Sequence, residues 1–199
     1  MKKLFLMILM VFFTTTATFA QVRKGSITVQ PKVGFNIANV TSGDGADARI
    51  GLAVGAEFEF GLSDIFSLSA GALYSMQGCK GAVEIADGGY TVDADAKLDY
   101  INIPILANVY VAKGLAVKCG IQPGFNVKHK AGAEVSGVKV TTDFPGIKSV
   151  DFSIPVGLSY QINNFVADAR YNLGLTSLLD GDDSKNSVFQ VTFGYKFAL

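Results

Sequence analysis

The chain has no tryptophan, one histidine and two cysteines among its 199 residues, and only 17% of its residues are charged. Basic and acidic residues number 17 each, so the formal net charge is zero. A nucleic-acid-binding domain is expected to carry an excess of basic residues gathered on one surface. The balanced charge therefore gives no indication of a nucleic-acid partner.

Long apolar runs are also scarce, because only residues 4–13 form one. This run follows two lysines and is short against the roughly 20 residues that a membrane-spanning helix needs. Thr18-Phe19-Ala20 has the small-residue spacing of a secretory cleavage site. We predict a cleaved signal peptide at residues 1–20 and a single domain at residues 21–199, with a membrane anchor as the alternative. Losing the two lysines takes the 17 basic residues to 15 against 17 acidic ones, a formal charge of −2.

Glycine and aromatic residues are abundant instead, with 22 Gly, 15 Phe and 7 Tyr, and the apolar residues are dispersed in alternation. The clearest case is residues 187–197. A β-strand points successive side chains to opposite faces, so one face here is wholly apolar and the other small or polar. Such a strand suits a wall with lipid on one side and water on the other. Its apolar face comprises Phe189, Val191, Phe193, Tyr195 and Phe197.

Eight alternating segments follow one another along the chain, and their connections alternate in length. Three connections are tight turns, at residues 62–65, 112–114 and 162–164. The others are long and rich in Gly, Asp, Ser and Lys, at residues 40–49, 78–97, 129–148 and 178–186. The eight segments are residues 27–39, 50–61, 66–77, 98–111, 115–128, 149–161, 165–177 and 187–197.

This sorting of short and long connections predicts the fold class. We expect an all-β chain that forms an eight-stranded antiparallel up-and-down transmembrane β-barrel, with short periplasmic turns and four longer outer loops. A secreted soluble β-sandwich would also alternate, but it has no reason to sort its loops by length. The predicted location is the outer membrane of the cell.

The strand alternation also assigns side chains to the lipid or to the lumen. An eight-stranded barrel is just wide enough for side chains to fill, and buried charges need partners. We therefore expect the four lumen acids to pair with the four lumen bases and to plug the barrel, with a narrow ion path as the alternative. This lumen polar network is predicted to comprise Lys32, Glu57, Glu59, Lys118, Asp151, Asp168, Arg170 and Lys196.

Phenylalanine and tyrosine must supply any aromatic girdle, since tryptophan is absent. Several of these residues fall near the ends of predicted strands, at the level where a barrel meets the membrane interface. The predicted periplasmic girdle consists of Phe60, Phe66, Tyr160, Phe165 and Phe197.

Three prolines, Pro104, Pro123 and Pro155, fall inside predicted strands. A proline has no N–H and so removes a hydrogen bond from the strand ladder. We expect a β-bulge or a local bend at these positions. A misassigned segment is the alternative.

No residue pattern indicates catalysis, and we predict no catalytic, cofactor or metal site and no enzymatic activity. His129 has Ser136 and Asp143 nearby in sequence, but no spacing marks a catalytic triad. Cys79 and Cys119 fall at opposite ends of predicted strands, too far apart for a disulfide. Two acidic groups are expected to be solvated loops because they lack the glycine turn and terminal Glu of a calcium loop: Asp93, Asp95 and Asp99, and Asp180, Asp182 and Asp183.

Over residues 21–199 the chain resembles the PorT-like outer-membrane β-barrel family, a group of small porin-like barrels of Gram-negative bacteria. The most specific segment is Leu98-Asp99-Tyr100-Ile101-Asn102-Ile103-Pro104-Ile105-Leu106. Other matching segments are residues 33–36, 62–68, 72–78, 152–157 and 193–197. The resemblance implies an eight-stranded outer-membrane barrel but no single function. The founding member is linked to protein secretion and gliding, and no motif here carries that role over.

The function expected from these features is that of a non-enzymatic barrel that anchors in the outer membrane and presents surface loops, with a lumen plugged by polar and charged side chains. The alternatives are an accessory component of a secretion or transport machine, and a narrow pore. Expected partners are outer-membrane lipid, the barrel-assembly machinery during insertion, and envelope or secretion-complex proteins. Many outer-membrane barrels end on an aromatic residue, and this chain departs from that pattern by ending on Phe197-Ala198-Leu199. Leu199 keeps the lipid-facing parity, so insertion by the barrel-assembly machinery is still expected.

Overall fold

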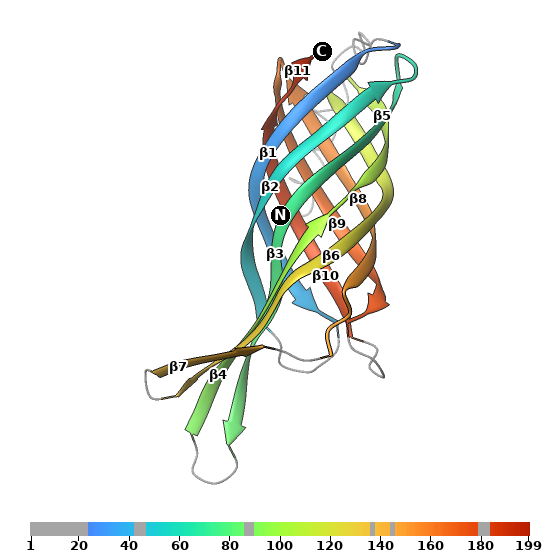
Figure 1. Ribbon diagram of the computed structural model, residues 1–199. Coiled ribbons are helices and arrows are strands. Elements are labelled where there is room, and N and C mark those ends of the chain that lie inside the picture. Colours follow the sequence, from blue (N-terminus) through green and yellow to red (C-terminus); the bar gives the residue numbers. More distant parts are fainter. Residues whose placement is uncertain (1–23, 42–46, 86–89, 136–137, 144–145, 179–183) are drawn as a thin grey trace, which may run out of the picture.

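The computed structural model describes residues 24–41, 47–85, 90–135, 138–143, 146–178 and 184–199. The predicted signal peptide at residues 1–20 lies outside the described residues. Within them, every regular element is a β-strand (Figure 1). Among the described residues, no helix is long and apolar enough to cross a membrane.

Eleven strand segments follow one another along the chain, and all of their pairings are antiparallel. They are β1 (Ile27–Val40), β2 (Asp47–Gly61), β3 (Phe66–Ile85), β4 (Tyr90–Asn102), β5 (Ile105–Ala112), β6 (Leu115–Val135), β7 (Val138–Asp143), β8 (Val150–Ile162), β9 (Phe165–Ser177), β10 (Lys185–Tyr195) and β11 (Phe197–Ala198).

The sheet closes on itself because β1 pairs with β2 on one side and with β10 on the other. β4 and β5 together form one wall strand, since both pair with β3 and β6 in a continuous register. β11 continues β10 past Lys196 along the same edge of β1. The result is a closed eight-stranded antiparallel up-and-down barrel of steeply tilted strands (Figure 1), which confirms the predicted fold class.

Tight turns gather at one end of the barrel, which we call the turn end. These are the connections between β2 and β3, β5 and β6, and β8 and β9, and the C-terminus lies at the same end (Figure 1). Asn163 in the last of these turns has φ 53°, and Gly114 has φ 76°. Glycine and asparagine tolerate this left-handed region best, and this conformation lets the chain reverse within a few residues.

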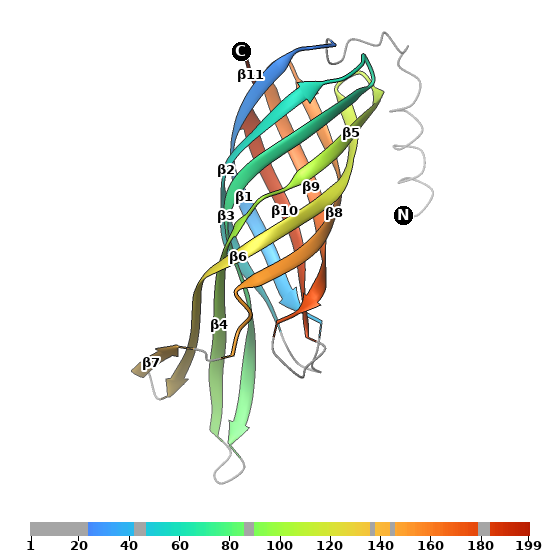
Figure 2. The same ribbon diagram turned by 45° about the vertical axis from the view of Figure 1, so that its right-hand side comes forward.

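The opposite end carries an extension of the sheet, which we call the arm (residues 78–85, 90–97, 128–135 and 138–143). β3 and β4 pair out to Ile85 and Tyr90, and β6 and β7 pair out to Val135 and Val138. Figures 1 and 2 show these strands leaving the barrel wall and running well beyond it. The two longest connections therefore rise from the wall as hairpins.

The predicted boundaries of the long loops were wrong at the arm. Residues 78–85 and 90–97 are strands rather than loop, as are residues 128–135 and 138–143. These segments do alternate apolar and polar residues, as at Tyr90-Thr91-Val92-Asp93, but their Gly, Asp and Lys content favours a loop. Pairing with the neighbouring strands extends them beyond the barrel wall.

Pro104, Pro123 and Pro155 do not form bulges, so that part of the prediction was wrong. Pairing on either side of Pro104 keeps one register against both β3 and β6. The registers around Pro123 and Pro155 are equally continuous. Each proline carbonyl can still accept, as when Pro123 O accepts from Ile103 N at 2.8 Å. Losing one hydrogen-bond donor costs less free energy than shifting the strand register by one residue, because that shift would turn every later side chain to the wrong face. A register shift does occur elsewhere, between Asp99 and Tyr100 against β6.

The two faces of the wall are sharply different in composition. Large apolar side chains point outward and are exposed on every wall strand, as at Phe35, Phe58, Val109, Leu158 and Phe193. The inward face is buried and mostly polar or charged. Phe60, Tyr160, Phe165 and Phe197 of the expected girdle are exposed at the turn end, whereas Phe66 is only half-buried.

Candidate functional site: the charged lumen

Five charged side chains meet inside the barrel at one level, and we call them the central cluster. They come from four strands and are each at most 5% exposed. All five belong to the predicted lumen network. The members are Lys32 on β1, Glu57 on β2, Lys118 on β6, and Asp168 and Arg170 on β9.

Glu57 and Asp168 each contact all three cations of the central cluster. Glu57 accepts from Arg170 Nη2 at 2.6 Å and Lys32 Nζ at 2.7 Å. Its remaining contact is with Lys118 Nζ at 3.2 Å. Asp168 lies 2.9 Å from Arg170 Nε and from Lys118 Nζ, and 3.3 Å from Lys32 Nζ. Three cations thus share two anions, so each member depends on the others for charge compensation. The cluster carries one positive charge in excess.

A second group lies nearer the turn end and is built around Glu59. This carboxylate accepts from Lys196 Nζ at 2.7 Å, from Ser67 Oγ at 2.6 Å and from the Tyr110 hydroxyl. Lys196 Nζ also lies 6.0 Å from the centre of the Tyr110 ring. Glu59 and Lys196 were both predicted, whereas Tyr110 and Ser67 were missed. Strand parity alone would have found Tyr110, because it alternates with Val109 and Val111 and so must point inward.

Replacing Tyr110 with phenylalanine is expected to lower the free energy of unfolding by about 1–2 kcal/mol. The variant loses a hydrogen bond to a charged acceptor and leaves Glu59 with fewer donors. Urea unfolding of the protein in lipid vesicles measures the change. Tyr160→Phe is the matched control, because Tyr160 is exposed on the outer face and has no hydrogen bond among the described residues. An equal loss in both variants would contradict a role for the Tyr110 hydroxyl.

Asp151 does not join a cation, so its predicted ion pair is wrong for the described residues. Its carboxylate accepts from Thr176 Oγ1 and from Asn186 Nδ2, the latter at 3.0 Å. The reason is distance along β8. Lys118 lies opposite Gly157, six residues from Asp151, which is roughly 20 Å at the rise of an extended strand.

An amide-rich layer separates Asp151 from the central cluster. Gln190 Nε2 donates to Asn36 Oδ1 at 2.8 Å, and Asn36 Nδ2 donates to Ser75 Oγ at 2.9 Å. The cavity beside these residues measures about 10 Å³, which is room for about one water molecule. Asn172 lines it, and neither of its amide atoms has a partner among the described residues. The full lining is Gln77, Asn102, Gln122, Asp151, Ser153, Asn172, Asn186 and Val188.

Apolar side chains cover the arm end of the lumen. Leu98, Tyr100 and Leu178 are buried against one another, and Val40 and Ile147 pack on them. The lumen therefore changes character along its length, from two charged groups through an amide layer to an apolar cover.

The other residues singled out from the sequence stay apart from the lumen charges. His129 is exposed, and its ring nitrogen Nδ1 lies 3.1 Å from Asn126 Oδ1. Cys79 and Cys119 are both free, on β3 and β6. Asp99 accepts from the Tyr74 hydroxyl at 2.7 Å and lies 3.7 Å from Lys128. No group of three or more potential metal ligands is found in the described part of the chain. The acidic residues at 180, 182 and 183 lie outside it.

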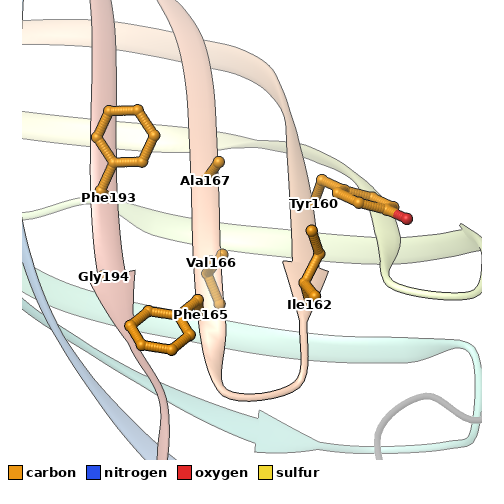
Figure 3. Close-up of a pocket in the computed structure, with 7 residues that line it drawn as sticks. All are labelled: Tyr160, Ile162, Phe165, Val166, Ala167, Phe193 and Gly194. Atoms are coloured by element: carbon orange, nitrogen blue, oxygen red, sulfur yellow. The ribbon is translucent and has the colours of Figure 1, made fainter.

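A shallow apolar groove of about 140 Å³ lies on the outer surface near the turn end (Figure 3). It is formed by β8, β9 and β10, and its walls include Tyr160, Phe165 and Phe193. The groove continues the exposed apolar face of the barrel.

A closed barrel with an apolar outside and a charged inside can rest in a membrane but not in water. The sequence profile of the outer membrane protein beta-barrel domain family matches residues 19–180. The chain belongs to this family. It is an outer-membrane protein, and by the rule for such barrels the turn end faces the periplasm and the arm faces outward.

Solved structures of small barrels are similar to this chain at low sequence identity. The crystal structure of Neisserial surface protein A (NspA) is 14% identical, with a TM-score of 0.51 over 87% of this chain and 100% of that chain. Ail, the attachment invasion locus protein of Yersinia pestis, is 16% identical, with a TM-score of 0.47 over 87% of this chain and 99% of that chain. No curated protein matches the chain in sequence. At these identities the comparison with NspA shows the fold alone.

Proposed function

We propose that the protein is a non-enzymatic outer-membrane barrel that anchors in the membrane and presents its arm and outer loops beyond it, with a lumen closed to ions. The single observation that supports this best is the central cluster, in which five buried charges from four strands are mutually paired across the lumen. An open aqueous pore would instead leave such side chains solvated along the wall.

Closure is further supported above and below the cluster. The group around Glu59 occupies the lumen toward the turn end, and Leu98, Tyr100 and Leu178 cover the arm end. Eight strands leave an interior that side chains alone can fill. The cavity of about 10 Å³ in the amide layer is too small for a hydrated ion. These layers leave the outer surface, and above all the arm, as the part available for function.

Single-channel recording in planar bilayers tests the closed lumen. The folded protein is expected to give no steady conductance above that of the lipid alone, because each charged side chain is held by several partners. A cold detergent gel before and after boiling checks that the recorded protein is folded. A steady and sizeable conductance from folded protein would contradict closure and would favour the narrow-pore alternative.

A role as an accessory component of a secretion or transport machine is the second candidate, and the arm favours it. Sheet edges that extend beyond the membrane offer unpaired backbone groups to a partner protein. Recovery of a defined envelope complex after mild detergent extraction, and its loss when the arm hairpins are shortened, would support this candidate over simple anchoring.

Export and assembly of the chain follow from the same proposal. We propose cleavage after Ala20 and insertion of residues 21–199 by the barrel-assembly machinery. The C-terminal strand supports recognition by that machinery, because Phe193, Tyr195, Phe197 and Leu199 all lie exposed on the outer face. Determination of the N-terminal sequence of the protein in outer-membrane fractions tests the cleavage site.

A further inference from the structure

The cavity in the amide-rich layer is small, polar and enclosed by side chains of several strands. Its volume is about 10 Å³, which is room for about one water molecule. Asp151 lines it from β8, Asn172 from β9 and Asn186 from β10. A single small occupant of this cavity would therefore meet polar groups from three consecutive strands at once.

Two of the lining side chains are buried and have polar atoms without partners. Asn172 and Asn186 are each 3% exposed. Neither amide atom of Asn172 has a hydrogen-bond partner among the described residues, and the same is true of Asn186 Oδ1. Leaving a buried polar atom unpaired costs free energy, and in native proteins such atoms commonly mark a bound water molecule or ion.

The lining offers acceptors more than donors. Asn186 Nδ2 already donates to the Asp151 carboxylate, at 3.0 Å. Gln77 and Gln122 each donate through Nε2 to a serine hydroxyl, at 2.9 and 3.2 Å. Asn172 has an unpartnered donor as well as an unpartnered oxygen, but the other amides have their nitrogens engaged. A lining of amide oxygens and one carboxylate disfavours an anion and favours a cation.

The charge of Asp151 also calls for a cation. This half-buried carboxylate accepts hydrogen bonds only from neutral groups among the described residues. The positive excess of the central cluster is remote, because Lys118 and Arg170 lie opposite Gly157, six residues from Asp151 along β8. That separation is roughly 20 Å at the rise of an extended strand. A monovalent cation would balance the single charge, whereas a divalent one would leave a positive charge uncompensated in the lumen.

We propose that this cavity is a binding site for one sodium ion, held without its water shell by the Asp151 carboxylate and the side-chain oxygens of Asn172 and Asn186. Hard cations prefer carboxylate and amide oxygens, and a bare sodium ion is smaller than a water molecule. The described residues contain no group of three or more His, Cys, Asp and Glu ligands, so amide oxygens complete the site. An ion held in this way is compatible with a lumen closed to ion flow, and the inference does not rest on conductance.

Urea unfolding of the full chain in phosphatidylcholine vesicles tests the site, with sodium chloride compared with choline chloride at equal ionic strength. A ligand that binds only the folded state raises the ratio of folded to unfolded protein, by about tenfold when its concentration is about ten times the dissociation constant. The wild-type protein is therefore expected to unfold at higher urea in sodium, and potassium is expected to give a smaller rise because the ion is larger.

Two variants locate the sodium response at the cavity. Asp151→Asn removes the charge and is expected to unfold at the same urea concentration in both salts. Asn172→Leu fills the cavity and removes both amide atoms while keeping Asp151, and it is expected to lose the response too. Asp64→Asn is the matched control, because it removes a carboxylate from an exposed turn and is expected to keep the full response. A cold detergent gel confirms that each variant is folded, and either cavity variant is sufficient for the comparison.

The proposal fails on any of three results. Equal urea midpoints for the wild-type protein in sodium and in choline would show that the cavity holds water only. An undiminished sodium response in the folded cavity variants would place the ion elsewhere. A rise with potassium or calcium that equals or exceeds the rise with sodium would contradict a small monovalent ion in this cavity.

Discussion

Replacing Glu57 with glutamine is expected to lower the free energy of unfolding by about 3–5 kcal/mol, the cost of removing one partner from a buried ion-pair group. Glu57 contacts Lys32, Lys118 and Arg170 at 2.6–3.2 Å, and it is 2% exposed. Glutamine keeps the shape but removes the charge, so three buried cations are left with Asp168 alone. Urea unfolding of the protein in lipid vesicles, followed on cold detergent gels, measures the loss.

Two further variants make this result specific to the central cluster. Asp64→Asn removes a carboxylate from an exposed turn and is expected to leave the stability unchanged. Adding Lys118→Met to Glu57→Gln returns the cluster to an excess of one positive charge and is expected to recover part of the loss. If Glu57→Gln costs less than about 1 kcal/mol, which is typical of solvated pairs, the lumen is wet at this level and the proposal of a closed barrel fails.

Replacing Val156 with arginine is expected to lower the free energy of unfolding in lipid vesicles by about 2–4 kcal/mol. Val156 lies in the middle of β8 and is 43% exposed on the outer face. Arginine there must reach the interface or remain in hydrocarbon, and the penalty is greatest at the midplane of the membrane. Ile162→Arg is the control on the same strand, because Ile162 lies at the turn end, where the cost falls to about 0–1 kcal/mol.

The comparison of these two arginine variants measures depth rather than mere tolerance of arginine. Equal losses at Val156 and Ile162 would contradict the assignment of the turn end to the membrane interface. Equal stability of both variants in vesicles would contradict burial of the outer face in lipid.

The closed barrel could be predicted from the sequence because a strand alternates its side chains with a period of two. Every member of the predicted lumen network lies on the inward face, from Lys32 on the first strand to Lys196 at the end of the last. The same parity places Phe189 and Phe193 outward. The predicted tight turns marked the ends of the strands correctly, because few residue types tolerate the backbone conformation of so short a turn.

The arm was not delimited from the sequence, because the Gly, Asp and Lys residues within 78–97 favour a loop even though apolar and polar residues alternate there. Residues 78–85 and 90–97 are strands because β3, β4 and β6 pair beyond the barrel. The bulge expected at the prolines was also wrong. The local rule predicts a bulge at Pro104, but pairing with two neighbours at once holds the register.

The sequence by itself determined the closed eight-stranded wall, its outward apolar face and its inward charges, because each depends only on alternation along one strand. The tertiary structure alone decided which charges meet. Lys32 Nζ lies 2.7 Å from the Glu57 carboxylate and 3.3 Å from the Asp168 carboxylate, although Lys32 and Asp168 are 136 residues apart in the chain. Asp151 has the right parity but lies too far along β8 to join them. The depth at which each side chain lies is set by strand stagger and barrel closure, and no single strand contains that information.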